Sequence, residues 1–379
     1  MQSPPFPPRL PWRDGNLFRL LPDGDRFFPA FLEAMDEARR FIWLELYLFE
    51  SGRAAGEFIS RLERARERGV SVHLLLDHFG AHGLVGADRD RLRASGIELA
   101  FYNPLSYGRL RRNLFRDHRK ILVVDGEVAF TGGFGVTDEF YAPGDPLAWR
   151  ETAVEIRGPL VADWQALFRA NWSRWSDTLL PEPPSPPPSL PGGVRGRVTV
   201  SPPRKGQTGV KRSFQARVRH ARERIYLATA YFVPSRRLRR HLMRAARRGV
   251  DVRLLLPGRH TDHPAVRLAG RRFYDRLLRA GVRIYEYQPR FLHQKVILCD
   301  DWASIGSSNL DRWNLRWNLE ANQEVRDPAF AAEVKQMLET DLAESLEISP
   351  YPWARRTWGE RLGEWFFGHL DRWLDRWLR

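Results

Sequence analysis

The chain has 379 residues, 43% of them hydrophobic, which is enough for two ordinary domains with full cores. Lysine and arginine number 61 against 46 acidic residues, and a net charge of +15 favours an anionic partner, either nucleic acid or an acidic membrane surface. The only cysteine, Cys299, excludes an intramolecular disulfide, and its apolar neighbours indicate a small buried residue rather than a reactive thiol.

The N-terminal residues 1–14 are rich in proline and predict an irregular arm without the apolar core of a signal peptide. The most apolar stretch, residues 41–49, is short and contains Glu45, whereas a membrane-spanning helix needs about 20 apolar residues. We therefore expect a protein that stays on the cytoplasmic side of the cell membrane and touches it only peripherally.

Helix-like and strand-like patterns alternate after the arm. Residues 57–68 have helical spacing, with four apolar side chains on one face and Gly69 as a stop signal. Residues 72–76 are a short apolar run, as in a strand buried on both faces. Gly249 and residues 252–256 repeat this pattern. Such alternation predicts an α/β fold with mixed, mostly parallel sheets flanked by helices.

A proline-rich run, PEPPSPPPSLPGG at residues 181–193, predicts a stiff spacer between two halves. The halves resemble each other in order and offset, and this indicates a duplicated domain. The matched pairs of segments are RFIWLELY (40–47) with RIYLATAY (224–231), ERGVSVHLLL (67–76) with RRGVDVRLLL (247–256), and HRKILVVD (118–125) with HQKVILCD (293–300). We predict an arm at 1–14, domains at 15–180 and 194–350 related by a pseudo-two-fold axis, and a tail at 351–379.

The pattern HxKxxxxD occurs once in each half, as His118, Lys120 and Asp125 and as His293, Lys295 and Asp300. On a strand, residues i and i+2 point to the same face, so each motif presents an imidazole beside an ammonium. An imidazole can attack phosphorus or shuttle a proton near neutral pH, and an ammonium suits phosphate oxygens. Two copies in duplicated units therefore predict one phosphodiester-processing site.

These motifs resemble those of the phospholipase D superfamily, in which HxKxxxxD is followed by Gly-Gly or Gly-Ser and often by Asn. Here the following residues are TGG (131–133) and GSSN (306–309). The segments YFVP (231–234), GVRIYEYQP (281–289) and NLEAN (318–322) are similar to bacterial cardiolipin synthases, in particular to a short branch without N-terminal transmembrane helices. The resemblance runs from about Gly15 to Ile348.

The resemblance implies a single active site where the halves meet. It assigns His118 as the nucleophile that becomes a phosphohistidine and His293 as the general acid and base, although the near-symmetry leaves the reverse order open. Lys120 and Lys295 would hold phosphate oxygens, and the two aspartates would make structural hydrogen bonds. Gly133, Ser307 and Asn309 would complete the phosphate site; Gly135 stands where many members have Asn.

Each histidine needs an orienting carboxylate on its second ring nitrogen. By resemblance, Glu320 is the orienting acid of the second half and Glu151 that of the first. No cluster with metal-ligand spacing is visible, so neither a metal nor another cofactor is expected. The role of Asp262 and His263, which resemble a family loop, is left open.

The C-terminal tail predicts an amphipathic helix rich in tryptophan and arginine. Such a face suits a membrane interface, and the alternative is that it packs on the protein's own core. The basic run at residues 109–116 could also meet anionic head groups.

The leading functional hypothesis is transphosphatidylation, in which two phosphatidylglycerols give cardiolipin and glycerol, with phosphatidylglycerol and the membrane surface as partners and without nucleic acid. The alternatives are a phospholipase D-type hydrolase, a phosphodiesterase or nuclease of the same superfamily, and a non-catalytic membrane scaffold. The oligomeric state does not follow from the sequence.

Overall fold

The computed structural model of the chain describes residues 10–106, 108, 111–141, 147–201, 209–309, 317–350 and 353. The first half contains β1 (Arg13–Pro22), α1 (Gly24–Glu37), β2 (Phe41–Leu46), α2 (Arg53–Glu67), β3 (Ser71–Asp77), α3 (Gly86–Ala94), β4 (Glu98–Tyr102), the 3-10 turn η1 (Arg112–Leu114), β5 (Arg116–Asp117), β6 (Ile121–Val124), β7 (Val128–Gly132), β8 (Thr152–Arg157) and α4 (Val161–Trp175).

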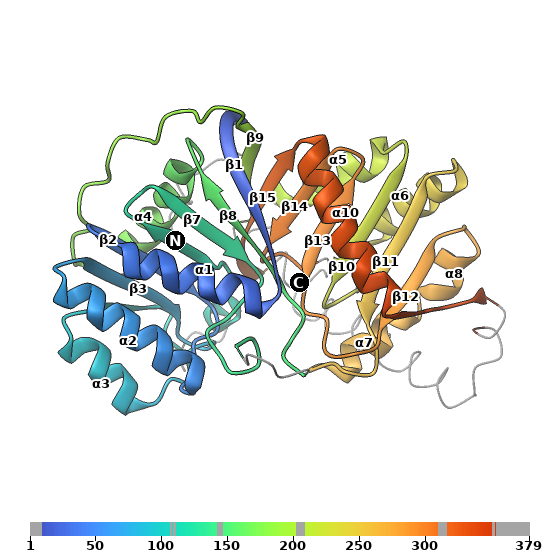
Figure 1. Ribbon diagram of the computed structural model, residues 1–379. Helices are drawn as coiled ribbons and strands as arrows, with labels where there is room; N and C mark the ends of the chain where they lie inside the picture. The colour runs from blue at the N-terminus through green and yellow to red at the C-terminus, as the bar shows by residue number, and fades with distance from the viewer. Residues whose placement is uncertain are drawn as a thin grey trace.

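The second half repeats this order after residue 193 (Figure 1). It contains β9 (Val194–Ser201), α5 (Gly209–His220), β10 (Arg224–Thr229), α6 (Arg236–Arg247), β11 (Asp251–Pro257), α7 (Pro264–Arg271), α8 (Tyr274–Leu278), β12 (Arg283–Tyr287), β13 (Lys295–Cys299), β14 (Trp302–Gly306), β15 (Asn318–Arg326), α10 (Pro328–Ala343) and β16 (Ser345–Glu347). The predicted duplication is therefore confirmed at the level of the fold.

The strands of both halves form one continuous 16-stranded sheet in the order β16-β12-β11-β10-β13-β14-β15-β9-β1-β8-β7-β6-β2-β3-β4, with β5 beside β15. The order is nearly palindromic about the antiparallel pair of β1 and β9, as a pseudo-two-fold relation requires. Helices cover both faces (Figure 1). The predicted α/β class is confirmed.

The expectation of mostly parallel pairing is wrong. Among the described strands, parallel pairing is confined to the outer strands of each half, β2-β3-β4 and β10-β11-β12, and to the short pair of β5 with β15. The inner strands around both motifs are antiparallel. The connections explain the difference, because β2 and β3 are joined through a helix whereas β6 and β7 are joined by a tight turn at residues 125–127.

The helix predicted at residues 57–68 is α2, and all four of its expected core residues are buried: Phe58, Ile59, Leu62 and Ala65. It ends where Gly69 adopts a φ of +85°, a conformation that glycine enters without steric cost. The strands predicted at 72–76 and 252–256 are β3 and β11.

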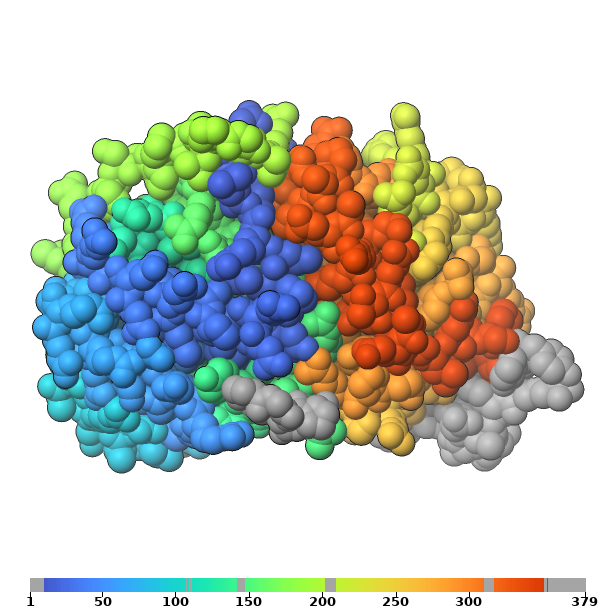
Figure 2. Space-filling model, viewed as in Figure 1, coloured from blue at the N-terminus to red at the C-terminus, as the bar shows by residue number. Residues whose placement is uncertain are grey.

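Alternate residues of the strands enter different cores. In β2, Ile42 and Leu44 join α1 and α2 in one cluster, whereas Phe41 and Trp43 point to the other face and meet α4. The latter cluster also contains the buried residues of α10, so one core joins the halves. In Figure 2 the two halves form a continuous surface, with α10 beside β1, where Phe18 and Phe330 are in ring contact.

The proline-rich segment 181–193 contains no helix or strand and lies against the first half, where Leu190 N donates to Gly15 O over 2.9 Å. The proposed domain limits stay a prediction, although β1 begins at Arg13, inside the predicted arm. Most of the predicted tail helix lies outside the described residues. Within the described part of the chain, no helix combines the length and apolarity that crossing a bilayer requires.

Candidate active site

The two motifs lie where the halves meet, at corresponding positions of the repeat. His118 and Lys120 precede β6, and His293 precedes β13, which begins at Lys295. A strand through each complete motif was expected, but the histidines lie just before their strands. Each main chain is fixed by the opposite half, because His118 N donates to Leu319 O (3.0 Å) and His293 N donates to Arg150 O (2.8 Å).

These cross-half backbone bonds decide which carboxylate each imidazole meets. Glu320 follows Leu319, and its Oε2 lies 3.2 Å from Nδ1 of His118. Glu151 follows Arg150, and its Oε2 lies 2.7 Å from Nδ1 of His293. The expectation that each glutamate serves its own half is therefore wrong, and the pairs are crossed. Neither half contains a complete site by itself.

The ring nitrogens face different surroundings as a result. Nδ1 of His118 also lies 3.2 Å from the carbonyl oxygen of Ser307, so a proton on Nδ1 can be donated to either acceptor. Both imidazoles are almost fully buried. With Nδ1 engaged, Nε2 is the nitrogen that can face a substrate in each ring, and that of His293 also lies 3.1 Å from Lys295 Nζ.

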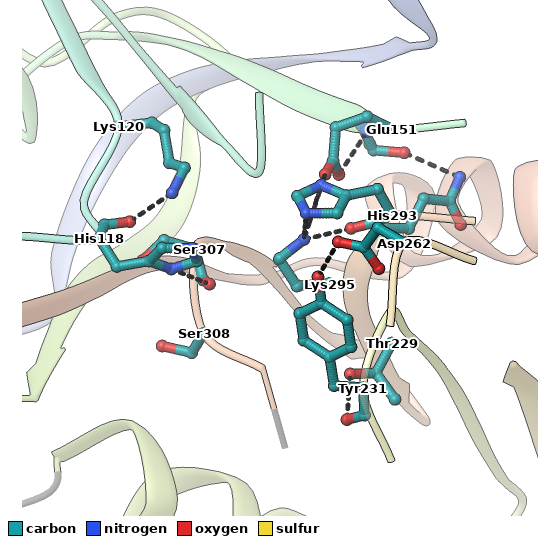
Figure 3. Close-up of polar contacts among 12 residues, drawn as sticks. His118, Lys120, Glu151, Thr229, Tyr231, Asp262, His293, Lys295, Ser307 and Ser308 are labelled. Atoms are coloured by element: carbon teal, nitrogen blue, oxygen red, sulfur yellow. Dashed lines mark hydrogen bonds and ion pairs between the residues drawn. The ribbon is translucent and has the colours of Figure 1, made fainter. Parts of the chain in front are cut away.

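The two motif lysines are buried beside the imidazoles (Figure 3). Lys120 Nζ donates to the carbonyl oxygen of His118 over 2.7 Å and lies 5.3 Å from the ring centre of Tyr47. Lys295 Nζ lies 3.4 Å from Glu151 Oε2 and 2.9 Å from Nδ1 of His293, and it also donates to the His293 carbonyl oxygen. Both ammonium groups therefore lie within reach of an anion at the imidazoles.

Burial perturbs every ionisable group of the chamber. It lowers the pKa of both histidines well below 6.5, and the neighbouring ammonium groups add to this effect. Burial also lowers the pKa of Lys120 to about 7, and it raises the pKa of Glu151 to about 7 and that of Glu320 to about 8. Each His–Glu pair can therefore gain or lose one proton near neutral pH.

The motif aspartates lie at the opposite ends of β6 and β13 from the histidines. Asp125 accepts from the backbone N–H groups of Arg39, Arg40 and Phe41, each over 2.8 Å. Asp300 does the same for residues 222–224 over 2.9 to 3.0 Å. Both adopt a positive φ, 55° and 52°. These carboxylates fix the entry into β2 and β10 and do not enter the chamber.

The residues after β7 and β14 shape the pockets of the glutamates. A Cβ at Gly133 would lie 2.1 Å from Glu151 Oε2, so only glycine leaves room for that carboxylate. Ser307, the corresponding residue, instead donates its hydroxyl to Glu320. Asn309 is fully buried, whereas a Cβ at its counterpart Gly135 would lie 2.8 Å from Leu48 Cβ. The shared motif therefore supports two different carboxylate pockets.

Aromatic side chains line the chamber, and they were not predicted from the sequence. Tyr47 packs edge-on to His118 with ring centres 5.0 Å apart. Four rings surround His293 at 5.2 to 6.5 Å: Phe140, Trp149, Tyr231 and Phe291. Tyr47 and Tyr231 end matched segments of the repeat, so this shared position could have identified them as candidate site residues.

The described residues contain no group of three or more His, Cys, Asp or Glu side chains arranged to hold a metal ion. The chamber instead combines two imidazoles, two carboxylates and two ammonium groups from both halves. Such a set can bind a phosphodiester, attack its phosphorus through nitrogen and protonate a leaving alkoxide. This defines a phosphodiester-transferring enzyme of the phospholipase D type.

Comparisons with known proteins agree with this class. The sequence model of the family described as "Cardiolipin synthase, PLD-like domain" matches residues 31–172 and 215–342, and the chain belongs to this family. The chain is 40% identical to cardiolipin synthase A of Pseudomonas aeruginosa over 348 residues, 90% of this chain and 70% of that protein. Cardiolipin synthase A of Pseudomonas fluorescens is 38% identical over 347 residues, 90% of this chain and 71% of the relative.

Solved structures share the fold at lower identity. Phosphatidylserine synthase of Haemophilus influenzae matches with a TM-score of 0.69 and 13% identity, over 95% of this chain and 93% of that one. Polyphosphate kinase of Porphyromonas gingivalis matches with a TM-score of 0.59 and 18% identity, over 89% of this chain and 49% of that one.

Proposed function

We propose that the protein is a phosphatidyltransferase that forms cardiolipin from two phosphatidylglycerols and releases glycerol. The observation that carries this proposal is the crossed pair of buried imidazoles, each with Nδ1 on a glutamate of the other half and a lysine beside it. The cardiolipin synthase relatives supply the substrate class, a phospholipid at a membrane.

The first step is displacement of the donor head group. Nε2 of His118 attacks the phosphorus of one phosphatidylglycerol, a P–N bond forms, and the P–O bond to glycerol breaks. The protonated His293 donates its proton to the departing glycerol oxygen. Glu151, 2.7 Å from Nδ1, stabilises the charged imidazole before this transfer.

The second step returns both histidines to their starting state. His293, now neutral, removes the proton from a glycerol hydroxyl of the second phosphatidylglycerol. That oxygen attacks the phosphorus, the P–N bond to His118 breaks, and cardiolipin is released. Splitting the transfer into two displacements lets one buried site replace one alcohol by another without free water as an intermediate acceptor.

The lysines and the residues that shape the pockets would stabilise the charge that develops on the phosphoryl oxygens. Lys120 and Lys295 are buried, and an ammonium in a dry site interacts more strongly with an oxyanion than it does in water. Asn309 would offer its amide to the same oxygens, while Gly133 and Ser307 position the two glutamates. Asp125 and Asp300 act only through the backbone that they hold.

The substrate places the protein at a membrane surface, and we assign it to the cytoplasmic side as a peripheral protein. The net charge of +15 suits an anionic bilayer such as one rich in phosphatidylglycerol. In the basic run before the first motif, Arg111 is exposed and Arg112 half-buried, whereas Arg116 is buried and paired with Asp77. The tail that was predicted to bind the interface lies outside the described residues and stays a prediction.

The test is a product analysis. Purified protein is incubated with phosphatidylglycerol vesicles in the presence of EDTA, and the lipids are identified by mass spectrometry. Cardiolipin and glycerol in equal amounts are expected. Phosphatidic acid as the main product would identify a hydrolase instead, and cleavage of DNA without lipid turnover would identify a nuclease.

A further inference from the structure

A second polar cluster lies at the mouth of the second half-site, after β10 and β11. The hydroxyl of Tyr231 donates to Oδ2 of Asp262, and the ring of His263 lies 5.5 Å from the ring of Tyr231. Nε2 of His263 is 3.7 Å from Asp262 Oδ2. The side chain of His263 is 62% exposed and that of Asp262 23%, so both can be reached from solvent.

The cluster faces the catalytic groups. In Figure 3 Asp262 lies between Tyr231 and the pair of His293 and Lys295. The ring of Tyr231 is 6.5 Å from that of His293. The carboxylate of Asp262 acts on Lys295, whose pKa it raises against the larger lowering by burial. The Asp262 carboxylate therefore lies close enough to the second motif to act on a group bound there.

The position in the first half that aligns with Asp262 is not a carboxylate. The repeat aligns Tyr47 with Tyr231, but the residue 180 positions before Asp262 is His82, the same offset that relates Gly69 to Gly249. His82 is exposed, and its loop is held instead by Asp77, which accepts from the N–H groups of Phe79 and Gly80. Of these two aligned positions, only the one in the second half carries a carboxylate.

We propose that Asp262, oriented by Tyr231, is the specificity residue that binds the hydroxyl groups of the polyol acceptor next to His293. A carboxylate accepts hydrogen bonds strongly and donates none, so it favours a vicinal diol, whose second hydroxyl can donate to it while the first reacts. This inference rests on the proposed function, because it presumes that an alcohol rather than water completes the transfer.

The chemistry of the step is unchanged by this contact. The reacting hydroxyl gives its proton to Nε2 of His293, its oxygen forms the new P–O bond, and the P–N bond to His118 breaks. The neighbouring hydroxyl remains intact and donates to Asp262. The carboxylate therefore selects which alcohol reacts and does not take part in bond making.

The test is a competition between two acceptors that differ by one hydroxyl. The full chain, with phosphatidylglycerol as donor, receives equal concentrations of propane-1,2-diol and 1-propanol, and the two transfer products are counted by mass spectrometry. The product ratio is independent of total activity, so it remains meaningful for a weakened variant. The wild type should favour the diol about tenfold, as expected for one hydrogen bond to a charged acceptor.

Asp262→Asn should bring the product ratio close to one, because a neutral amide oxygen is a weaker acceptor of the same shape. Tyr231→Phe should lower the ratio about threefold, since the carboxylate stays but loses its orienting partner. His82→Ala, at the aligned position of the first half, should leave the ratio as in the wild type.

An active Asp262→Asn variant that keeps the full diol preference overturns the inference, because Asp262 would then only hold Tyr231. If Asp262→Asn is too weak to measure, an unchanged ratio in Tyr231→Phe overturns it equally. A wild type that makes phosphatidic acid in place of both transfer products overturns the proposed function itself, and a wild type that transfers to both alcohols without preference overturns the specificity role alone.

Discussion

The two half-sites use the same residue types but hold them differently. Nδ1 of His118 is shared between Glu320 and a carbonyl oxygen, both at 3.2 Å. Nδ1 of His293 has a shorter contact of 2.7 Å with Glu151, and the ammonium of Lys295 lies against the same ring. A close carboxylate stabilises an imidazolium, so the second half-site is better suited to carry the proton and the first to attack phosphorus.

The buried contacts of the residues that follow the two histidines in the sequence differ as well. Below His118, Arg119 forms an ion pair of 2.8 Å with Glu45, and both are fully buried. At the corresponding positions the second half has Gln294 and Thr229, and Gln294 donates to Thr152 and to Asp341 over 3.0 Å each. The two halves therefore share the chamber, but a buried charge pair supports it in one half and an amide network supports it in the other.

We expect the largest loss of activity when either motif histidine is replaced, and the loss should be similar for both. His118→Ala and His293→Ala should each reduce lipid turnover at least about 10⁴-fold. Residues of one catalytic unit depend on one another, so losing one of them costs about as much rate as losing all of them. The melting temperature should stay near that of the wild type, since neither ring is central to a hydrophobic cluster. Near-normal turnover of phosphatidylglycerol by either variant would show that the halves work independently.

The next largest effect is on stability, and it distinguishes the Arg119–Glu45 ion pair from the Gln294 amide network. Arg119→Leu should lower the free energy of unfolding by about 3–5 kcal/mol, because it leaves Glu45 buried without its cation. The matched change Gln294→Leu should cost only about 1–2 kcal/mol, since Asp341 keeps its ion pair with Arg150. Urea unfolding measures both values.

The Arg119→Leu loss should also depend on pH. Burial raises the pKa of Glu45 well above its usual value, and removing Arg119 raises it further. A carboxyl whose pKa is raised by folding contributes stability at low pH and loses it as pH rises through the folded value. The variant should therefore be less stable at pH 8 than at pH 5, and a loss independent of pH would contradict the role of the charge pair.

The crossed carboxylates can be assigned with an activated donor. Glu151→Gln and Glu320→Gln should each slow transfer from phosphatidylglycerol about 100-fold. A phosphatidyl p-nitrophenol donor has a leaving group that needs no proton, so the first-turnover burst of p-nitrophenol should recover in Glu151→Gln as in His293→Ala. It should stay slow in Glu320→Gln as in His118→Ala. Recovery in Glu320→Gln but not in Glu151→Gln would mean that the assigned roles are reversed.

The smallest effect is a shift in the pH profile. One His–Glu pair must have released its proton and the other must hold one, so the rate should be bell-shaped, with both limbs near neutrality. Burial raises the pKa of Glu151 to about 7 and that of Glu320 to about 8, which sets this range. Glu151→Gln should move the pH optimum to lower pH and reduce the maximal rate, because its imidazolium loses a stabilising charge. A flat profile with chemistry rate-limiting would count against paired imidazoles.

Much of this architecture could be predicted from the sequence. The matched segments at 67–76 and 247–256 gave the duplication and the parallel outer strands, because order and offset recur together. Strand direction near the motifs was mispredicted because a run of apolar residues does not show whether a buried strand pairs in parallel or antiparallel with its neighbour. The tight turn after Asp125 was the available signal for an antiparallel pair.

The site could be predicted as a set of residues but not as a set of partners. Glu151 and Glu320 were singled out and each lies beside a motif histidine, yet their crossing depends on contacts between segments more than 140 residues apart. The contact of Tyr231 with Asp262 and the aromatic rings around His293 likewise depend on loops whose paths no local pattern specifies.

If both halves build one site with one nucleophile, each chain can carry only one covalent intermediate at a time, and this number can be counted. Wild-type enzyme is mixed with phosphatidylglycerol, quenched at alkaline pH within the first turnover, digested and analysed by mass spectrometry. We expect at most one phosphatidyl group per chain, on the peptide that contains His118. Two groups per chain, or a group on the peptide of His293 with His118 unmodified, would contradict it.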